Sequence, residues 1–255
     1  MKRSILLFTS LLAAQVLVAQ NRTEPDTFET ECADMMVQPI VHGSLVLQHD
    51  SEVIYVDPYG GVEAYIGLPT PTLLLITDIH GDHLHAPTLE ALVTRGATLV
   101  VPQAVADQLP EKFADYDIVV LDNGKKRKVN TVNIEAIPMY NLPESPDSRH
   151  TKGRGNGYLL TICNKRVYIS GDTEDIPEMR ALEDIDIAFV CMNLPYTMSV
   201  DQAADAVIEF SPAVVYPFHY RGQGGLSDVE KFKALVDASE ATVDVRLKDW
   251  YPAGE

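Results

Sequence analysis

Basic residues are scarce in this sequence, and their scarcity limits the partners to be expected. Lys and Arg together number 20 against 37 Asp and Glu, so the formal net charge at pH 7 is −17. A field of this sign repels phosphate backbones and anionic lipid surfaces, so we expect no nucleic acid and no membrane as partner of the mature chain. A solvated acidic surface without functional meaning is the alternative explanation of the same charge.

Cysteine is almost absent, with three residues that are odd in number and far apart. Cys163 and Cys191 lie in strand-like segments, where a thiol behaves as a small hydrophobic side chain, and we expect both to be buried rather than to bind metal. Cys32 lies in a polar, acidic segment, and for it a free thiol and a disulfide both remain open.

A membrane-spanning helix needs ~20 apolar residues, and the mainly apolar run near the N-terminus, Ile5 to Val18, has only 14. It follows the basic pair Lys2-Arg3 and precedes the small residue Ala19, in the order typical of a secretory signal peptide. We therefore expect cleavage near Ala19 and export to the periplasm or the extracellular space. Loss of the two basic residues brings the net charge from −17 to −19.

Internal repeats, low-complexity tracts and Gly/Ser- or Pro-rich linkers are missing from the rest of the chain, which favours one domain. We expect a signal peptide at residues 1–19, a leader at residues 20–36 and a single domain at residues 37–255. A chain of 255 residues with 46% hydrophobic residues can bury the core of one large α/β domain.

Short strand-like and helix-like segments alternate along this domain. A β-rich first part passes into alternating strands and helices, and the order hairpin, helix, strand, helix, strand follows. Two mixed sheets that face each other, each with helices on its outer face, would bury these patterns, so the expected fold is α/β, a four-layer αβ/βα sandwich. The predicted strands are 38–48, 52–57, 72–77, 98–101, 117–121, 131–137, 157–162, 166–169, 185–191, 213–217 and 243–247, and the predicted helices are 87–95, 103–109, 177–182, 200–210 and 228–238.

Three of the seven histidines crowd into one segment directly after the apolar strand 72–77, which reads Asp78-Ile-His-Gly-Asp-His-Leu-His85. A segment with this many polar side chains is unsuited to a hydrophobic core, whereas imidazole and carboxylate groups together suit zinc and other first-row divalent ions. We expect Gly81 to let the backbone bend tightly, so that His80 faces one ion while Asp82 and His83 face another.

The segment Thr77-Asp-Ile-His-Gly-Asp-His83 resembles the H-x-H-x-D-H signature of the metallo-β-lactamase superfamily. Three later features are similar to that family in the same order: His150 ahead of a hairpin, Tyr168-Ile-Ser-Gly-Asp-Thr173, and Val215-Tyr-Pro-Phe-His219. Within the family, this chain is most similar to the ascorbate-6-phosphate-lactonase-like branch of small hydrolases. The segments that resemble this branch are Pro138-Met-Tyr-Asn141, His150-Thr-Lys-Gly-Arg-Gly-Asn-Gly-Tyr158, and Met198 with the helix that carries Gln202 and Ala203. The resemblance spans residues 38–248.

This resemblance implies a site for two divalent metal ions, zinc above all. Asp172 would bridge the two ions beside a shared hydroxide, and together with Asp82 it would hold the nucleophile, so both count as candidate catalytic residues. The ions would lower the pKa of that water and polarise a substrate carbonyl or phosphoryl oxygen. The resemblance implies that one ion is bound by His80, by His150 and by the residue at position 78 if that residue is a ligand. It implies that the other ion is bound by Asp82, His83 and His219.

Position 78 departs from the family pattern, because this chain has Asp78 where the signature begins with His. Asp78 is either a metal ligand or a partner that orients a ligand His, and the sequence leaves both open. As a ligand it would bring the sum of three carboxylates, two divalent ions and one hydroxide to zero, against +1 in the family pattern. Its carboxylate oxygen also shifts the metal preference toward manganese or iron.

Other polar residues near predicted strand ends are weaker candidates. His42 would either line the site or be a half-buried structural residue, His85 is expected at the surface or beside a ligand, and His49 is expected to be solvated in a turn. Arg154 and Arg221 would hold a substrate carboxylate or phosphate, or pair with some of the acidic residues. Substrate contacts, or only hydrogen bonds to the backbone, are expected from Tyr140, Asn141, Asn193 and Tyr196.

Together these motifs predict a metal-dependent hydrolase that acts on a small ester, lactone or amide. A phosphodiesterase on the same centre is one alternative, and a metal-binding protein without turnover is another. The basic run Lys125-Lys126-Arg127-Lys128 is expected in a hairpin turn. Because no Lys/Arg cluster lies near the predicted site loops and the chain is acidic, we expect small-molecule substrates and not oligonucleotides. The sequence indicates neither the substrate itself nor the oligomeric state.

Overall fold

The computed structural model describes residues 22–252 of the chain. The predicted signal peptide lies outside the described residues. Among residues 22–252, every helix is too short or too polar to cross a membrane.

The first half of the chain forms a seven-stranded sheet whose strands follow one another in sequence order. β1 to β4 pair antiparallel, and β4 to β7 pair parallel. The strands are β1 (Asp26–Phe28), β2 (Met35–Val41), β3 (Ser44–His49), β4 (Glu52–Val56), β5 (Leu73–Leu75), β6 (Thr98–Val101) and β7 (Ile118–Val120).

The second half forms another seven-stranded sheet, in the order β16-β13-β12-β11-β10-β9-β8. β8 to β11 are antiparallel, whereas β11, β12, β13 and β16 are parallel. Its strands are β8 (Lys126–Val129), β9 (Val132–Met139), β10 (Gly155–Ile162), β11 (Lys165–Ile169), β12 (Ile187–Cys191), β13 (Val214–Phe218) and β16 (Asp244–Val245), and a small hairpin joins β14 (Arg221–Gly222) to β15 (Gly225–Leu226).

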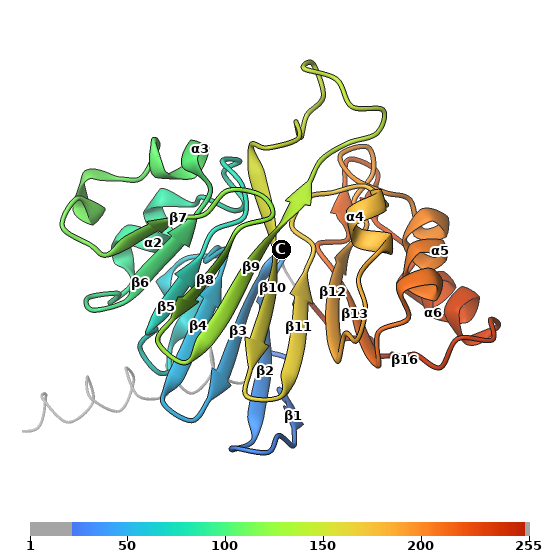
Figure 1. The fold of residues 1–255 in the computed structure, drawn as a ribbon, viewed down its shortest axis with the longest axis horizontal. Helices are drawn as coiled ribbons and strands as arrows, with labels where there is room; N and C mark the ends of the chain where they lie inside the picture. The colour runs from blue at the N-terminus through green and yellow to red at the C-terminus, as the bar shows by residue number, and fades with distance from the viewer. Residues whose placement is uncertain (1–21, 253–255) are drawn as a thin grey trace, which may run out of the picture.

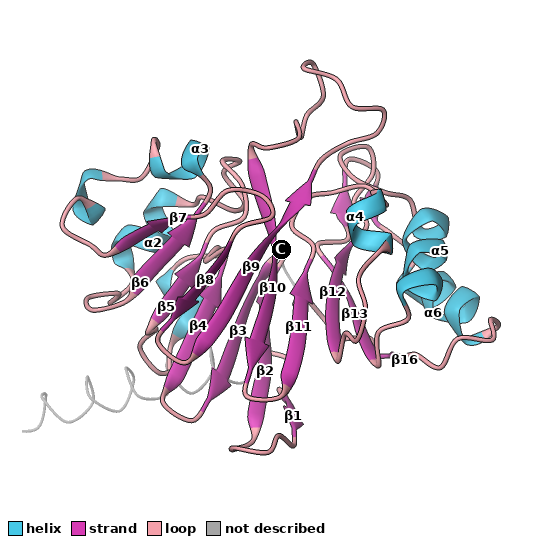
Figure 2. Cartoon of the chain, viewed as in Figure 1, coloured by secondary structure: helices cyan, strands magenta, loops and turns pink. Residues whose placement is uncertain are grey.

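Helices cover the outer faces of both sheets (Figures 1 and 2). Leu89 of α2 and Val105 of α3 belong to the buried cluster outside the first sheet, and Val207 of α5 packs on the second. The expected four-layer αβ/βα sandwich is therefore confirmed. The helices are η1 (Val62–Tyr65), α2 (Ala86–Ala91), α3 (Gln103–Ala106), η2 (Glu111–Phe113), α4 (Pro177–Arg180), α5 (Val200–Phe210) and α6 (Val229–Asp237).

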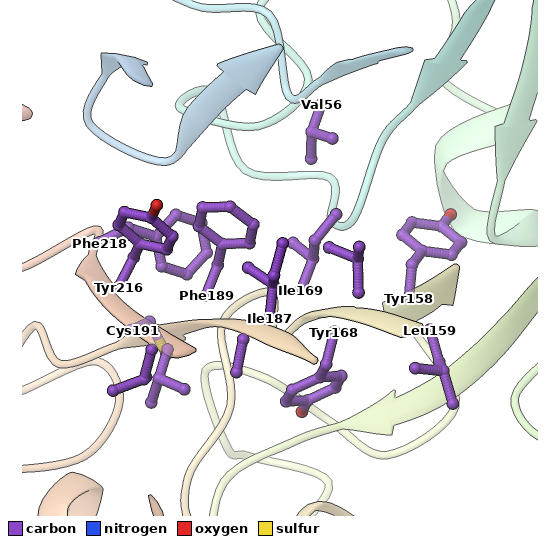
Figure 3. Close-up of a cluster of buried hydrophobic side chains, with 14 of the residues drawn as sticks. Val56, Tyr158, Leu159, Tyr168, Ile169, Ile187, Phe189, Cys191, Tyr216 and Phe218 are labelled. Carbon is purple, nitrogen blue, oxygen red and sulfur yellow. The ribbon is translucent and has the colours of Figure 1, made fainter. Parts of the chain in front are cut away.

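The main core lies between the two sheets and follows the alternation of side chains along each strand. Leu45 and Leu47 point into it, whereas Val46 belongs to the outer cluster. Figure 3 shows the same division in the second sheet, where Ile169 lies on the side of Val56 and Tyr168 points the other way. Because both faces are apolar there, inner strands such as β4, β5, β6, β12 and β13 are buried on both sides, as their apolar runs predict.

Three local features differ from the sequence-based expectation. The predicted strand 38–48 is two strands, β2 and β3, because the chain reverses at His42-Gly43, where His42 has a positive φ of 57°. The basic run 125–128 was expected in a turn, but residues 126–128 belong to the edge strand β8. Part of the predicted leader forms β1, which pairs with β2.

The expectation for Cys163 is wrong, because this residue forms a disulfide with Cys32. The bond joins the segment after β1 to the β10–β11 turn, so it fastens the start of the described chain to the second sheet. Cys191 is buried, as expected, and its thiol is free.

Candidate metal centre

Histidines and aspartates gather in loops at one edge of the two sheets. The segment 78–85 follows β5, His150 precedes β10, Asp172 follows β11 and His219 follows β13. These residues come from both halves of the chain, and the strand ends bring them together as the sequence pattern predicted.

Local backbone geometry fixes Asp172 at this edge. The preceding Gly171 has a φ of +61°, and a Cβ there would lie 2.7 Å from Sδ of Met139. Glycine is the residue that tolerates this conformation at little cost. Glycine is therefore required before Asp172, because the chain turns sharply at Gly171 and has no room for a side chain there.

Three groups of possible ligand atoms lie at this edge, each with its atoms within 4.8 Å of one another. The two that we call clusters consist of Asp78, His80 and His150, and of His83, Asp172 and His219, and the third group, His42, Asp82 and His219, adjoins the second cluster. Asp82 borders the second cluster, because its Oδ2 lies 3.4 Å from Nε2 of His219.

The Asp172 carboxylate lies between the clusters. Its Oδ2 is 3.2 Å from Nε2 of His150 and 3.3 Å from Nε2 of His83. Its Oδ1 is 3.4 Å from Nε2 of His219. One carboxylate thus contacts histidines of both clusters, which is the arrangement that a bridging ligand requires.

Several of these atoms are buried without a hydrogen-bond partner in the described part of the chain: Nε2 of His83, both ring nitrogens of His150 and of His219, and Oδ1 of Asp172. A buried polar atom left unpaired costs about 1–3 kcal/mol. Imidazole nitrogens and carboxylate oxygens that converge in this way fit divalent cations, which would satisfy most of them at once.

Mutual electrostatics hold these groups in charged states. Burial raises the pKa of Asp172, but the charges of His219 and His83 outweigh it and hold that pKa well below the usual range. Burial lowers the pKa of His83, but Asp172, Asp57 and Asp82 outweigh it and raise the pKa well above the usual value. The clusters therefore attract positive charge, whether a proton or a metal ion.

Asp57 orients His83, and the sequence did not reveal it. Its Oδ2 lies 2.7 Å from Nδ1 of His83, and both side chains are buried. Thr77 donates its backbone N–H and its hydroxyl to the same carboxylate. With Nδ1 occupied, Nε2 of His83 faces Asp172 and is left for a metal. The one signal in the sequence was that Asp57, like Asp172 and His219, comes shortly after a strand.

Asp78 is fully buried and bound by an arginine. Arg154 donates from Nε to Oδ1 (3.1 Å) and from a terminal nitrogen to Oδ2 (2.9 Å). The same Oδ2 is 2.6 Å from Nδ1 of His80. Burial raises the pKa of Asp78, but the hydrogen bond from His80 and the nearby charges outweigh it and bring the pKa to about 2. Arg154 therefore holds Asp78, and its predicted alternative role in substrate binding is not what the structure shows.

His42 lies beside the second cluster and contacts Asp82. Its Nε2 is 3.1 Å from Oδ2 of Asp82, and its Nδ1 is 2.8 Å from the hydroxyl of Tyr251. That hydroxyl accepts the backbone N–H of Arg221. Burial and the neighbouring His219 lower the pKa of His42 to about 4, so the imidazole is neutral at pH 7. Of the two readings left open for His42, the structure places it at the site.

Two cavities meet at the second cluster. One has a volume of about 270 Å³ and is lined by His42, Asp82, Arg149, Asp172, Asn193, Tyr196, Arg221, Gly222 and Gln223. The other, of about 650 Å³, shares His42, Asp82 and Arg221 with it and adds Val41, Tyr59, Gly60, Gly61, His85 and Tyr251. A third cavity of about 650 Å³ lies between α2 and η2 and is lined by none of the clustered ligands. A small molecule can therefore reach Asp82 and Asp172 from solvent.

The predicted substrate contacts divide into two groups. Asn193, Tyr196 and Arg221 line the smaller cavity. Tyr140 and Asn141 do not, because the Tyr140 hydroxyl donates to Glu178, and Asn141 accepts the backbone N–H of His150. These two residues support the loop that carries His150.

Arg149 was missed by the sequence reasoning. Its guanidinium lies 4.4 Å from the ring centre of Tyr196, at the wall of the smaller cavity. It lies next to His150 in the sequence, and this adjacency was the available signal.

Two smaller expectations are wrong, those for His49 and Gly81, whereas the one for His85 is consistent with the structure. His49 was expected in a solvated turn, but it is buried at the end of β3 and contacts Oγ1 of Thr30. Gly81 does not need glycine, because a Cβ there would meet no atom within 4 Å and its φ is not positive. His85 caps α2, with Nδ1 accepting the N–H of Thr88, and it also lines the larger cavity.

Known proteins resemble this chain over most of its length. A Pyrococcus horikoshii protein named as a metal-dependent hydrolase is 30% identical over 177 residues, which cover 67% of this chain and 77% of that protein. The crystal structure of a candidate metal-dependent hydrolase from Parabacteroides distasonis is 38% identical, with a TM-score of 0.79, and covers 90% of this chain and 100% of that one. A metallo hydrolase from Ignicoccus hospitalis, 24% identical with a TM-score of 0.71 over 84% of this chain and 95% of that one, shares the fold.

The family described as the β-lactamase superfamily domain matches residues 37–219, which include every clustered ligand. The predictions of this family and of a metal-dependent hydrolase are confirmed at that level. The chain belongs to the metallo-β-lactamase superfamily, among relatives that are named metal-dependent hydrolases.

Proposed function

We propose that this chain is a two-metal hydrolase that acts on a small ester, lactone or amide. The observation that carries the proposal is the pair of buried ligand clusters, with unpartnered atoms, that share Asp172 beside an open cavity. Divalent ions bound there would lower the pKa of water and polarise the substrate carbonyl. The imidazole-rich clusters favour zinc, and the Asp78 oxygen admits manganese or iron as alternatives.

The protein's own groups have separable tasks in this proposal. Asp172 holds the two clusters at a fixed separation, because its two oxygens contact different histidines. Asp82 has a side chain that is 32% exposed and lines both cavities, so it can accept a hydrogen bond from the attacking water. Asn193 and Tyr196 line the wall against which the substrate would rest.

A phosphodiesterase is the second candidate, and it is favoured by Arg149 and Arg221 at the smaller cavity. Guanidinium groups match the geometry of phosphate oxygens as well as that of carboxylates. A panel that pairs small esters and lactones with small phosphodiesters separates the two candidates.

We also propose that the chain is exported and that its partner is a small molecule. The disulfide between Cys32 and Cys163 supports export, because disulfides persist in oxidising compartments and are rare in the cytosol. Detection of the mature chain only in the cytosol, with both thiols reduced, would contradict this proposal.

The proposed activity is tested by elemental analysis of the mature protein purified without chelator, followed by the substrate panel with the metals found. We expect two divalent ions per chain and hydrolysis that chelation abolishes. Asp172→Asn should abolish turnover. Asp186→Asn, which changes a carboxylate that binds Lys165 at the opposite end of the sheet, should not. Full activity in metal-free protein would refute the proposal.

A further inference from the structure

We infer that Arg154 makes the two metal positions unequal, so that the position at Asp82 fills first and the position at Asp78 is the weaker one. The inference rests on the two-metal centre proposed above and goes beyond it. We call the set Asp78, His80 and His150 the Asp78 position, and the set Asp82, His83 and His219 the Asp82 position.

The two positions offer ligands of the same kind. Each has one aspartate within 4.0 Å of two histidines, and histidines of both positions contact the shared Asp172. Ligand type alone would therefore give both positions similar affinities for the same ion. A difference must come from the groups that contact the two aspartates.

Those contacting groups differ by one unit of charge. The Asp78 carboxylate receives the paired hydrogen bonds of the Arg154 guanidinium, which carries a permanent positive charge. The Asp82 carboxylate is contacted by the imidazole of His42, and no Lys or Arg within the described residues 22–252 forms an ion pair with it. The charge of Asp78 is thus neutralised by Arg154, whereas the negative charge of Asp82 remains available to attract a metal ion.

The geometry of the arginine also limits how Asp78 can bind. Its Oδ1 accepts from Nε of Arg154, whereas Oδ2 accepts from the terminal nitrogen and lies 2.6 Å from Nδ1 of His80 and 3.9 Å from Nε2 of His150. Asp78 can therefore offer one oxygen, already hydrogen-bonded to a cation. Outer partners of ligands change metal affinity by about 10–100-fold, and a cationic partner of a carboxylate should weaken the hold on an ion by an amount in that range.

A titration of the metal-free mature protein with Zn²⁺, in competition with a chelating indicator, tests the inference. Wild type should bind two ions with dissociation constants at least about tenfold apart. Asp78→Asn should lose the weaker ion and keep the tighter one. Arg154→Gln, which removes the charge and frees Asp78, should tighten the weaker position by about tenfold and leave the tighter one unchanged.

Arg149→Gln is the matched control, because it removes the same charge from the cavity wall without touching Asp78. It should leave both constants within about threefold of wild type. Arg154→Lys keeps a charge at Asp78 and should keep the two constants apart, which gives a second readout if Arg154→Gln does not fold.

Several outcomes would overturn the inference. Two equal constants in wild type, or an Arg154→Gln protein that binds its second ion no more tightly, would remove Arg154 as the source of inequality. An equal gain in Arg149→Gln would show that charge anywhere at the cavity suffices. Failure of wild type to bind any ion would overturn the proposed function as well, whereas equal constants would leave that function standing.

Discussion

Asp57→Asn tests how the centre is built, because it replaces one carboxylate oxygen by an NH₂ group on a residue outside the clusters. Asp57 is buried and accepts three hydrogen bonds, from the N–H of Thr77, from its hydroxyl and from Nδ1 of His83. An asparagine has one oxygen in place of two, so its NH₂ group must face either Thr77 or His83 as a second donor. At least one of these buried donors then loses its acceptor.

The expected cost follows from the position of His83. Loss of the carboxylate that orients a ligand histidine typically lowers metal affinity by about 10–100-fold, or about 1.4–2.7 kcal/mol. The loss should fall on the Asp82 position, because His83 belongs to it, and the pKa of His83 should fall since Asp57 helps to raise it.

Chelator competition on the metal-free protein measures this loss, and the titration of His83 by NMR measures the pKa. Asp117→Asn is the control, because Asp117 also accepts a hydrogen bond in the first sheet, from Thr98, away from the clustered ligands. If Asp57→Asn changes both affinities by less than about threefold, Asp57 does not position His83 and the reasoning fails.

Three further predictions concern the same structure. Asp172→Ala should reduce kcat/KM at least about tenfold more than Asp78→Ala, because Asp172 contacts histidines of both clusters; equal losses at equal stability would contradict this. Removing the disulfide by Cys32→Ser opens a link across 131 residues, and the chain-entropy estimate of at most about 5 kcal/mol corresponds to a Tm lower by about 10–20 °C; calorimetry that shows no change would refute it. In the metal-free protein the pKa of His42 is lowered to about 4, against about 6.5 in the unfolded chain. The unfolded chain therefore binds more protons between these values, and stability should fall by at most about 3 kcal/mol as pH drops from 6.5 to 4. His42→Asn should flatten that slope in urea unfolding, and an unchanged slope would exclude His42 as its source.

Much of the fold was predictable because its inner strands are buried on both faces and read as short apolar runs between turns. The reversal at His42-Gly43 was missed because the flanking segments are equally apolar and His42 adopts an unusual positive φ. The disulfide was not predictable, since two cysteines 131 residues apart meet only once both sheets have formed. The basic residues of β8 were assigned to a turn because an exposed edge strand needs no apolar pattern.

The sequence pattern indicated which His and Asp residues lie together in the candidate centre, because each follows or precedes a strand at the same edge. Their supporting residues were not found. Asp57, Arg149 and Tyr251 are ordinary polar residues in the sequence, and only the folded chain brings them against His83, Tyr196 and His42.

At Asp78, the charge of the site depends on the hydrogen-bond partner Arg154 as well as on the residue type in the signature. On sequence alone, three carboxylates, two divalent ions and one hydroxide sum to zero, and replacing Asp78 by His would raise the charge of the site by one. Arg154 lies 76 residues away along the chain but binds both oxygens of Asp78, which would bring the sum for the proposed two-metal centre to +1. The aspartate–arginine pair is therefore equivalent in charge to the neutral His of the family signature. Asp78→His alone would leave the guanidinium facing an ion without its carboxylate, so a return to the family pattern requires that Arg154 be neutralised together with Asp78.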